Sequence, residues 1–349
     1  MNTAAHALPL IGITMGDPVG IGPEVVIKAL SCEDVYRRCR PFVLGDTAVL
    51  EKEKKALHSP LAIHVIEDPR QSAFTFGTLD IFSLSRLNPD TLRYGHPDQE
   101  TGTAMGTYIV RAAAMALCRE IDAMVTGPIN KKSLQEGGHP YPGHTEMLAR
   151  LTDTQDVVMM LAGEKLRVVL VTIHCAVSQV PRLLSREKIL NTVLITAEGL
   201  KNYFSLPAPR IAVASLNPHA GEEGMFGGEE AETILPAITE AQHRGVNVSG
   251  PYPADTLFYY AAQGRYDAVV CMYHDQGLIP LKLLHFEDGV NITLGLPIIR
   301  TSVDHGTAYD IAGKGIANPS SLIQAITIAS RMAAARQDQS PWKKPGVTI

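Results

Sequence analysis

The stretch RVVLVTIH, residues 167–174, is a run of aliphatic, mostly β-branched residues that ends in a histidine. Such a short apolar run is typical of a buried strand in a sheet that is covered on both faces. The next periodic stretch, residues 185–203, begins with Ser185 and predicts a helix. A buried strand followed by a helix is the repeating unit of an α/β fold.

The same alternation continues on both sides of this stretch. Short apolar runs predict strands, and amphipathic or alanine-rich runs predict helices. No repeat or low-complexity linker divides the chain, so composition marks no domain boundary. Strands are expected at residues 8–14, 42–44, 61–65, 123–126, 157–161 and 167–172, with the last two as neighbours. Helices are expected from the first glycine-rich turn to Leu30, at 102–119, from Asn130, and at 185–203, 229–244 and 320–336, followed by a frayed tail at 343–349.

Length and composition narrow the class of protein. A chain of 349 residues suggests two domains or one large one. The hydrophobic content of 45% supplies full cores, and the charged content of 19% excludes a disordered chain. The net charge of −5 offers no general attraction to nucleic acid or to a membrane surface. We find no signal-peptide pattern and no apolar run long enough to cross a bilayer, and therefore expect a cytoplasmic protein.

The cysteines agree with this location. Their odd number and scattered positions favour free thiols in a reducing compartment. One of them, Cys175, adjoins His174, which leaves a ligand or redox role open beside the simpler interpretation of a small buried residue. The five are Cys32, Cys39, Cys118, Cys175 and Cys271.

Three histidines, His174, His219 and His274, follow predicted strands in the same way. Ligands of α/β proteins bind at the carboxyl ends of strands. Three imidazoles there can take three positions of a divalent metal and leave others open for substrate. Their spacings of 45 and 55 residues are too wide for a zinc finger, so the fold has to assemble such a site. Each histidine on its own is more often a loop or core residue.

Two glycine-containing segments offer helix N-termini. The turn at residues 16–24 lacks both a dinucleotide fingerprint and a Walker lysine, and only Asp17 at its apex suggests chemistry. Gly143-His144-Thr145-Glu146 precedes a helical run, whose free N–H groups suit a phosphate or carboxylate. A simpler interpretation, equally weighted, is that Thr145 only caps that helix.

The C-terminal third holds two further clusters. Asp275 adjoins His274 and is a candidate hydrogen-bond partner for a metal-binding ring. Lys282, Asn291 and Arg300 would bind a phosphate or carboxylate if they converge on one pocket, although each alone is an ordinary surface group. Residues 305–319 form a long glycine-rich loop before the last helix, which suits either nucleotide binding or a plain connection.

These motifs resemble the 4-hydroxythreonine-4-phosphate dehydrogenase family over nearly the whole chain, from Ile13-Thr14-Met15-Gly16-Asp17-Pro18 to the final helix. Residues 305–319 also resemble the adenine-side loop of isopropylmalate and isocitrate dehydrogenases. The resemblance implies their two-domain α/β fold, with the active site in the interdomain cleft. Residues 1–135 and 300–349 would form the nucleotide-side domain, and residues 136–299 the domain with metal ligands and dimer contacts. The stretches that carry the resemblance are 143–146, 216–221, 254–258, 273–277 and 289–306.

The resemblance also implies a set of site residues. It implies a homodimer whose metal site takes ligands from both subunits, with NAD or NADP and one divalent ion (zinc, magnesium or cobalt) as cofactors. The implied metal ligands are His174, His219 and His274, the substrate contacts are His144, Thr145, Lys282, Asn291 and Arg300, and the cofactor contacts are Gly306, Asp310, Gly313 and Asn318.

The implied reaction is oxidation of the C3 hydroxyl of 4-phosphooxy-L-threonine with NAD(P), after which the 3-oxo acid loses carbon dioxide to give 3-amino-2-oxopropyl phosphate, a step of vitamin B6 biosynthesis. A divalent cation suits this chemistry because it stabilises the developing alkoxide. The sequence leaves open whether His144, Lys282 or Asp255 relays the proton.

One departure from the family concerns the segment after His174, which reads Cys175-Ala176-Val177-Ser178 where the family usually has a Pro-Leu or similar pair. Oxidation of D-threonate or D-erythronate 4-phosphate by the same ligands is therefore an open alternative. A metal-dependent hydrolase, which would activate water and would not need the loop 305–319, is the alternative from another reaction class. A non-catalytic sensor of phosphorylated metabolites is the third.

Overall fold

The structure, a computed structural model, describes residues 8–337. Its framework is a continuous twelve-stranded sheet with the strand order β3-β4-β2-β1-β5-β12-β11-β6-β7-β10-β8-β9. The strands are β1 (Leu10–Thr14), β2 (Arg40–Gly45), β3 (Ala62–Ile66), β4 (Thr78–Ser83), β5 (Ala123–Thr126), β6 (Val158–Ala162), β7 (Arg167–Leu170), β8 (Ile211–Ala214), β9 (Val248–Tyr252), β10 (Ala268–Cys271), β11 (Val290–Leu294) and β12 (Arg300–Val303).

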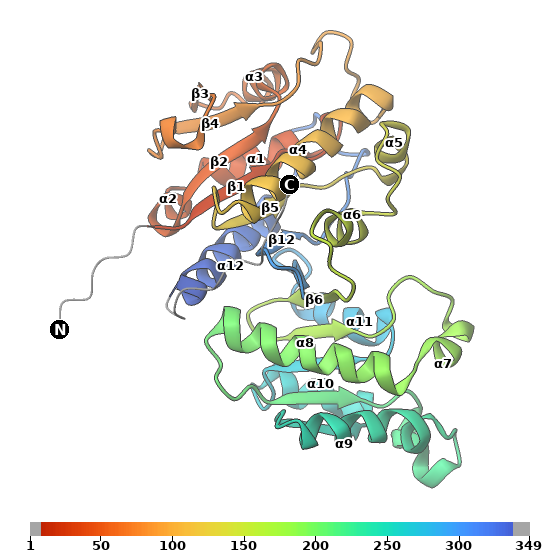
Figure 1. Cartoon of the computed structure of the whole chain (residues 1–349). Coiled ribbons are helices and arrows are strands. Elements are labelled where there is room, and N and C mark those ends of the chain that lie inside the picture. Colours follow the sequence, from red (N-terminus) through yellow and green to blue (C-terminus); the bar gives the residue numbers. More distant parts are fainter. Residues whose placement is uncertain (1–7, 338–349) are drawn as a thin grey trace, which may run out of the picture.

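Helices connect most of these strands and cover the sheet (Figure 1). The strands β5, β8, β10 and β12 are buried along their whole length, so both faces of the sheet are covered there. The helices are α1 (Gly22–Leu30), α2 (Glu33–Arg38), α3 (Thr47–Ala56), α4 (Gln99–Leu117), α5 (Lys131–Glu136), α6 (His144–Leu151), α7 (Val180–Leu183), α8 (Arg186–Phe204), α9 (Leu235–His243), α10 (Ala254–Ala262), α11 (His274–Leu284) and α12 (Ser320–Gln337), with short turns η1 (Pro69–Gln71), η2 (Val177–Gln179), η3 (Pro218–Gly224) and η4 (Glu230–Ile234).

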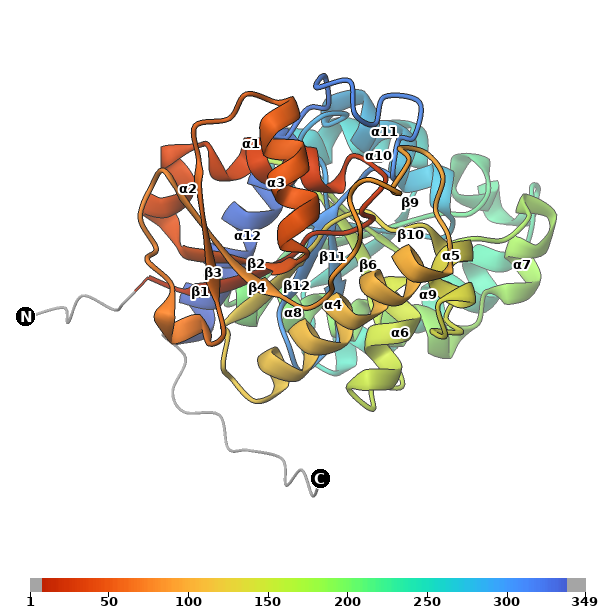
Figure 2. The same cartoon turned by 90° about the horizontal axis from the view of Figure 1, so that it is seen from above.

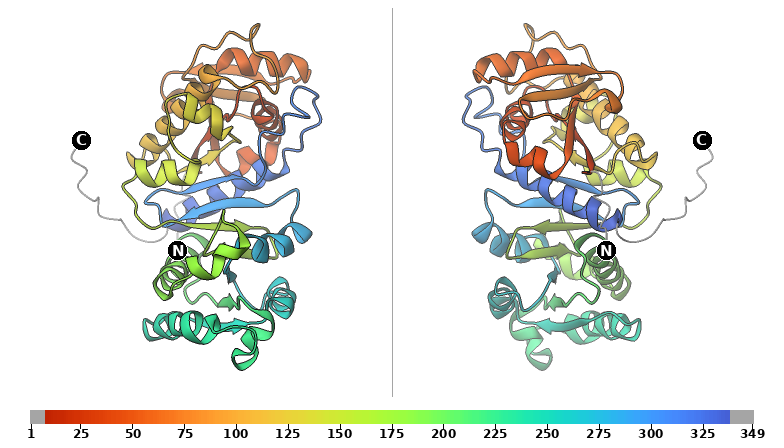
Figure 3. Two further views of the ribbon diagram at one scale, coloured as in Figure 1. Left: turned by 90° about the vertical axis from the view of Figure 1, so that its right-hand side faces the viewer. Right: turned by 90° about the vertical axis from the view of Figure 1, so that its left-hand side faces the viewer.

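The end of the described chain returns to its beginning. Strand β12 pairs with β5 in parallel, and α12 packs beside α1 and α2 (Figure 2). Strands β11 and β12 lie in the middle of the molecule, between the N-terminal segments and the segments that carry β7 to β10 (Figure 3). A domain built from both ends of the chain requires such a return. The domain boundaries at residues 135 and 300 stay a prediction.

The three histidine-bearing loops leave neighbouring strands. β10 is parallel to β7 on one side and to β8 on the other, so the carboxyl ends of all three lie along one edge of the sheet. These strands end at Leu170, Ala214 and Cys271, earlier than the apolar runs suggest. The histidines therefore sit in the loops or helix starts that follow the strands, which is where an α/β protein holds its ligands.

Much of the sequence-based assignment is confirmed. β6 and β7 are antiparallel neighbours, and Ser185 caps α8 by accepting a hydrogen bond from the Lys188 N–H at 3.1 Å. Some features differ from the expectation: β4, β9, α3 and α10 are among the elements that were not expected, and the helix expected at 229–244 opens with the π-helical turn η4. The expected tail at 343–349 lies outside the described residues. No helix in residues 8–337 has the length and apolar character needed to cross a membrane.

Candidate active site

His174 and His274 lie side by side after the ends of β7 and β10. Their ring centroids are 5.7 Å apart, with the ring planes tilted by 39°. The Nδ1 atom of His274 is hydrogen-bonded to the Asp275 carboxylate at 2.7 Å, which leaves Nε2 as the nitrogen available to a metal. Burial and the charge of Lys131 lower the pKa of His174, which favours the neutral ring that binds metals.

His219 lies on an unusual left-handed turn. The φ angles of His219, Ala220, Glu222 and Glu223 lie between 42° and 55°, a conformation that costs about 1–2 kcal/mol per residue outside glycine. Strained backbone of this kind concentrates at functional sites. The ring of His219 faces Phe226, with 6.3 Å between ring centroids.

The base of this turn is held firmly by Glu230. Its Oε1 atom accepts the N–H groups of Leu216 and Asn217 at 2.8 and 2.7 Å. The Asn217 side chain donates to both Glu229 and Glu230, at 2.8 and 3.0 Å. The turn that carries His219 is therefore a defined structure and not a loose loop.

Within one chain, the three histidines predicted as ligands supply only part of a site for a divalent ion. Two rings at the separation of His174 and His274 can reach a common ion from two sides. No group of three His, Cys, Asp or Glu side chains in residues 8–337 is arranged to hold a metal ion, so the three predicted ligands do not meet in a single chain. Of the three predicted ligands, only His174 and His274 lie close together among the described residues.

Arg300 is a buried cation without a carboxylate partner. Only 2% of the residue is exposed, and burial lowers the pKa of its guanidinium to about 9. Its hydrogen bonds go to neutral groups, and no ion pair of Arg300 is formed within the described chain. The bonds run from Nε and Nη2 to Thr126 Oγ1 at 3.2 and 2.8 Å, and from Nη1 to Thr293 Oγ1 at 2.9 Å and to Asn291 Oδ1 at 3.3 Å.

His144 is the first residue of α6, and the charge of Arg300 acts on its imidazole ring. Burial lowers the pKa of His144 well below its ordinary value, and the positive charges of Arg300 and Lys131 add to this effect. Its Nε2 atom is buried and has no hydrogen-bond partner among the described residues. A neutral ring with a free buried nitrogen is suited to exchange a hydrogen bond or a proton with a ligand.

The start of α6 has no side-chain cap. Its N-cap residue is Gly143, which offers no side-chain hydrogen bond to the helix. Thr145 lies inside the first turn, so the interpretation of Thr145 as the cap is wrong. Charges of both signs adjoin this place, since Glu146 Oε2 and Lys131 Cε lie 3.3 and 3.5 Å from where a Cβ on Gly143 would stand. Uncapped N–H groups beside a lysine form a setting that binds phosphate or carboxylate.

The other candidates for proton transfer differ in their surroundings. The Lys282 amine forms an ion pair with Asp304 at 2.8 Å and is not free. His305, next to Asp304, has a buried Nε2 atom without a partner in residues 8–337. Asp255 is exposed in the first turn of α10, and no hydrogen bond or ion pair joins it to the other predicted residues.

The loop 305–319 is tied to the first glycine-rich turn. Tyr309 donates to the buried Asp17 carboxylate at 2.5 Å, and the Ile21 N–H donates to the Thr307 carbonyl at 3.0 Å. Lys28 donates to the carbonyls of Gly315 and Ala317 at 2.9 and 2.8 Å. Asp17 therefore has a structural role, because its carboxylate joins two segments that lie far apart in the sequence.

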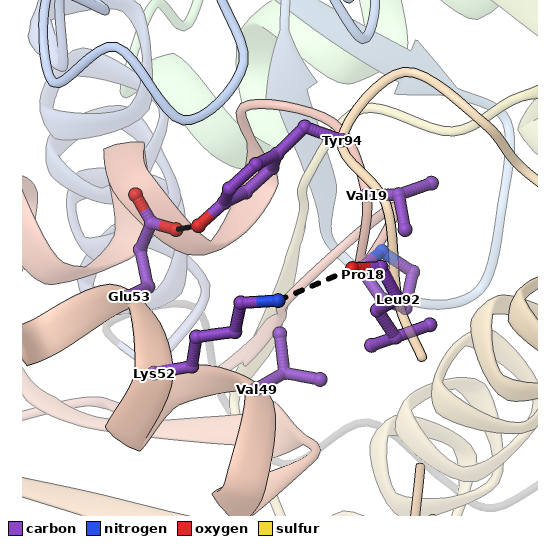
Figure 4. A pocket seen from close by; sticks show the side chains of 7 residues that line it. All are labelled: Pro18, Val19, Val49, Lys52, Glu53, Leu92 and Tyr94. Atoms are coloured by element: carbon purple, nitrogen blue, oxygen red, sulfur yellow. Dashed lines mark hydrogen bonds between the residues drawn. The ribbon is translucent and has the colours of Figure 1, made fainter. Parts of the chain in front are cut away.

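Gly313 in this loop has a packing reason to be glycine. Its φ is +73°, and a Cβ there would stand 2.4 Å from the ring of Tyr94. Tyr94 in turn donates to Glu53 at 2.6 Å (Figure 4). The cavity between these side chains measures about 10 Å³, which admits about one water molecule and no substrate. A larger cavity of about 450 Å³, lined by Arg167, Tyr203, Asp288 and Arg331 among others, contains none of the predicted site residues.

Several neighbours of the predicted residues have no local signal in the sequence. Lys131 is exposed and ordinary in composition, and Thr126 and Thr293 are residues expected in strands. Their roles depend on contacts with residues far away in the chain, so one sequence without its fold does not single them out. Each of the five cysteines is a free thiol, as expected.

Comparisons with known proteins agree with the resemblance seen in the motifs. The family model described as pyridoxal phosphate biosynthetic protein PdxA matches residues 37–329. The chain is 54% identical to the 4-hydroxythreonine-4-phosphate dehydrogenase of Desulforapulum autotrophicum, over 93% of this chain and 96% of that protein. It is 49% identical to the D-threonate 4-phosphate dehydrogenase of Cupriavidus necator, over 94% and 98% of the two chains.

Solved structures show the same relationship. The crystal structure of 4-hydroxythreonine-4-phosphate dehydrogenase from Klebsiella pneumoniae superposes with a TM-score of 0.88 at 42% identity, covering 94% of this chain and 99% of that one. The two-domain dehydrogenase fold expected from the motifs is thereby confirmed. Because the family model spans most of the chain and its relatives share about half of its residues, the chain belongs to the PdxA family of pyridoxal phosphate biosynthetic proteins.

Proposed function

We propose that the protein oxidises 4-phosphooxy-L-threonine at its C3 hydroxyl with NAD or NADP, and that the 3-oxo acid then loses carbon dioxide to give 3-amino-2-oxopropyl phosphate. The observation that carries this proposal is the 54% identity, over nearly the full length, to a 4-hydroxythreonine-4-phosphate dehydrogenase. The buried cation of Arg300 and the start of α6, which has no side-chain cap, support it, because the substrate carries two anionic groups.

Binding is assigned to two groups of residues. Arg300 and Asn291 hold one anionic end of the substrate, and His144, Thr145 and the first N–H groups of α6 hold the other. Lys282, paired with Asp304, completes the charged lining. A substrate anion would supply the counter-charge that Arg300 lacks in the described chain, and burial makes that interaction strong.

The base that takes the hydroxyl proton is assigned to His144. Its low pKa keeps the ring unprotonated near neutral pH, and its buried Nε2 has room for a new hydrogen bond. The two other candidates are less suited, because Lys282 is charged and paired while Asp255 is exposed and apart. A bound nicotinamide would accept the hydride from C3 as the proton leaves the oxygen.

The metal is assigned to His174, His219 and His274, with His219 contributed by a second subunit. When bound, a divalent ion supplies positive charge that stabilises the oxygen anions formed during oxidation and decarboxylation. Of zinc, cobalt and magnesium, a set of three imidazoles favours zinc or cobalt, because magnesium prefers oxygen ligands. Asp275 orients the ring of His274 toward the ion.

The cofactor is assigned to the loop 305–319 through Gly306, Asp310, Gly313 and Asn318. The bonds that join this loop to α1 and to Asp17 hold it in one conformation before any ligand arrives. Such preorganisation lowers the entropy that cofactor binding has to overcome. No residue of the loop distinguishes NAD from NADP on the geometry described.

A homodimer is supported by the surface of α11 and the residues just after it. This helix begins with His274 and carries Lys282, and its exposed side includes Ile279, Leu283 and Phe286. Leu283 is 84% exposed and Phe286 is 77% exposed, which is costly for large apolar side chains unless a partner covers them. A second copy seated here would bring its own residues to the metal site.

A second candidate substrate is D-threonate 4-phosphate, favoured by the 49% identity to the Cupriavidus necator enzyme. That compound keeps the carboxylate, the C3 hydroxyl and the phosphate, and it has a hydroxyl where the threonine derivative has an amine. The anion-binding residues and His144 therefore serve either substrate. D-erythronate 4-phosphate shares the same groups in a different configuration.

The proposal can be separated from a hydrolase by cofactor binding. We expect NAD at a hundredfold excess over its dissociation constant, with a divalent ion present, to raise the melting temperature by about 4 °C, because binding of that strength stabilises the native state by about 2.7 kcal/mol. The measurement is differential scanning fluorimetry, with adenosine as the matched control ligand. A hydrolase responds to the metal but not to NAD, and a sensor binds ligands without producing NADH.

A further inference from the structure

The guanidinium of Arg300 has five N–H groups, and the structure accounts for four of them. Thr126 accepts two, from Nε and from Nη2, while Thr293 and Asn291 accept one each from Nη1. One N–H group, on Nη2, has no acceptor within residues 8–337. The buried cation is thus fully oriented by the protein, with a single donor left over.

The choice of acceptors preserves the charge of Arg300. A carboxylate at the place of Thr126 would pair with the guanidinium and cancel its charge before a substrate arrived. A hydroxyl satisfies the same N–H groups and leaves the cation uncompensated. Glu146, the carboxylate that acts electrostatically on Arg300, lies on α6 and forms no ion pair with it.

We infer that Thr126 is a positioning residue for substrate recognition: its Oγ1 atom accepts two N–H groups of Arg300, fixes the plane of the guanidinium, and directs the remaining N–H toward the anionic group of the substrate. This inference rests on the proposed function, in which Arg300 binds that group. Thr293 assists by holding Nη1 on the opposite side.

The position of Thr126 is itself fixed by the centre of the sheet. It is the last residue of β5, fully buried, and stands in register with Ser302 of β12, whose hydroxyl donates to the Thr126 carbonyl at 3.1 Å. The strand that carries Arg300 is therefore locked to the strand that carries its acceptor. The backbone that carries the Thr126 hydroxyl is thus fixed relative to the backbone of Arg300.

The test is a comparison of valine and serine at position 126. Valine keeps the shape of threonine but removes the acceptor, so Thr126→Val is expected to raise KM for the phosphorylated substrate about tenfold to a hundredfold, with kcat changed by less than about threefold. Thr126→Ser keeps the oxygen and is expected to restore KM to within about threefold of the wild type. The measurement is NADH absorbance under steady state with the full-length protein and a divalent ion.

Thr301→Val is the matched control. Thr301 is also fully buried and adjoins Arg300 on β12, but its hydroxyl donates to the Ala325 carbonyl at 2.9 Å. This variant is expected to lose stability and keep its KM. If Thr126→Val does not fold, Thr293→Val removes one acceptor of Nη1 and is expected to raise KM by a smaller factor, about threefold to tenfold.

The outcomes separate this inference from the proposed function. A wild-type KM in Thr126→Val and in Thr293→Val, together with impaired Arg300→Lys, would overturn the positioning role and leave the function standing. An equal rise of KM in Thr301→Val, or no recovery in Thr126→Ser, would also overturn it, because a general packing effect would then explain the data. Wild-type kinetics of Arg300→Lys would remove Arg300 from the site and with it the proposed anion-binding arrangement.

Discussion

Alanine at His174, His219 or His274 is expected to abolish turnover and to lower the metal content of the purified protein, with the fold largely retained. The physical reason is that the proposed metal site takes its ligands from three imidazoles, two of which, His174 and His274, have 5.7 Å between their ring centroids. Metal content is measured by mass spectrometry and turnover by NADH absorbance. Full metal occupancy in His219→Ala would show that this histidine is no ligand.

Mixing variant subunits extends this prediction to the dimer. If His174 and His274 of one chain share an ion with His219 of the other, a heterodimer of His219→Ala and His174→Ala subunits has one intact site and one doubly damaged site. Its activity is then expected to return to about half of the wild-type value per heterodimer, by the symmetry of a two-fold assembly. The same recovery is expected for His219→Ala mixed with His274→Ala.

The control is the third mixture. His174→Ala and His274→Ala subunits damage the same pair from both sides, so each site of their heterodimer lacks one ligand and no recovery is expected. Recovery in this mixture would place the two histidines on different subunits, against the geometry of the chain. Three inactive mixtures, with subunit exchange proven by native mass spectrometry, would mean that all three ligands come from one chain.

Arg300→Lys is expected to lower kcat/KM at least about thirtyfold, because breaking a buried charged contact costs about 2–5 kcal/mol in known interfaces. From the sequence alone, lysine is expected to fail because it lacks the planar guanidinium group, which can bind an anion with two hydrogen bonds. The structure gives a different reason: the fork already binds Thr126, and a lysine amine cannot hold Thr126, Thr293 and Asn291 at once. Steady-state NADH kinetics measure the effect.

Arg167→Lys serves as the matched control for this variant. Arg167 begins β7, at the end of the strand opposite to His174, and it donates to the Asp267 carbonyl at 3.1 Å. Like Arg300 it is a shielded arginine, since burial lowers its pKa. Its replacement should reduce stability and leave kcat/KM unchanged, and an unchanged kcat/KM in Arg300→Lys as well would place Arg300 outside the site.

The sequence shows the framework of this site because strands and their ends leave local patterns. The apolar runs before His174, His219 and His274 predict strands, and the fold has them as β7, β8 and β10, which it also shows to be parallel neighbours. The resemblance of the motifs to the dehydrogenase family then implies roles for these histidines. β4 escaped detection because Asp80 interrupts its apolar pattern, although Asp80 is buried and accepts the N–H groups of Ala73 and Phe74.

The contacts that complete the site could not be predicted, for two physical reasons. Some join residues far apart in sequence: Thr126 meets Arg300 across 174 positions, and Asp17 meets Tyr309 across 292. Others depend on backbone conformations that the residue types disfavour. Nothing in the composition of the turn at His219 indicates left-handed φ angles at alanine and glutamate, since both avoid that region. Such exceptions arise where function constrains the chain.

The most direct test of the proposed function is an NADH absorbance assay on the purified protein with a divalent ion and NAD. The substrates are 4-phosphooxy-L-threonine, D-threonate 4-phosphate and D-erythronate 4-phosphate, each also incubated with His174→Ala as the control for contaminating activity. We predict NADH formation from 4-phosphooxy-L-threonine with the highest kcat/KM of the three, and none in the variant. A higher kcat/KM for D-threonate 4-phosphate would contradict the substrate assignment, and no NADH from any of the three, with NAD or with NADP, would contradict the dehydrogenase itself.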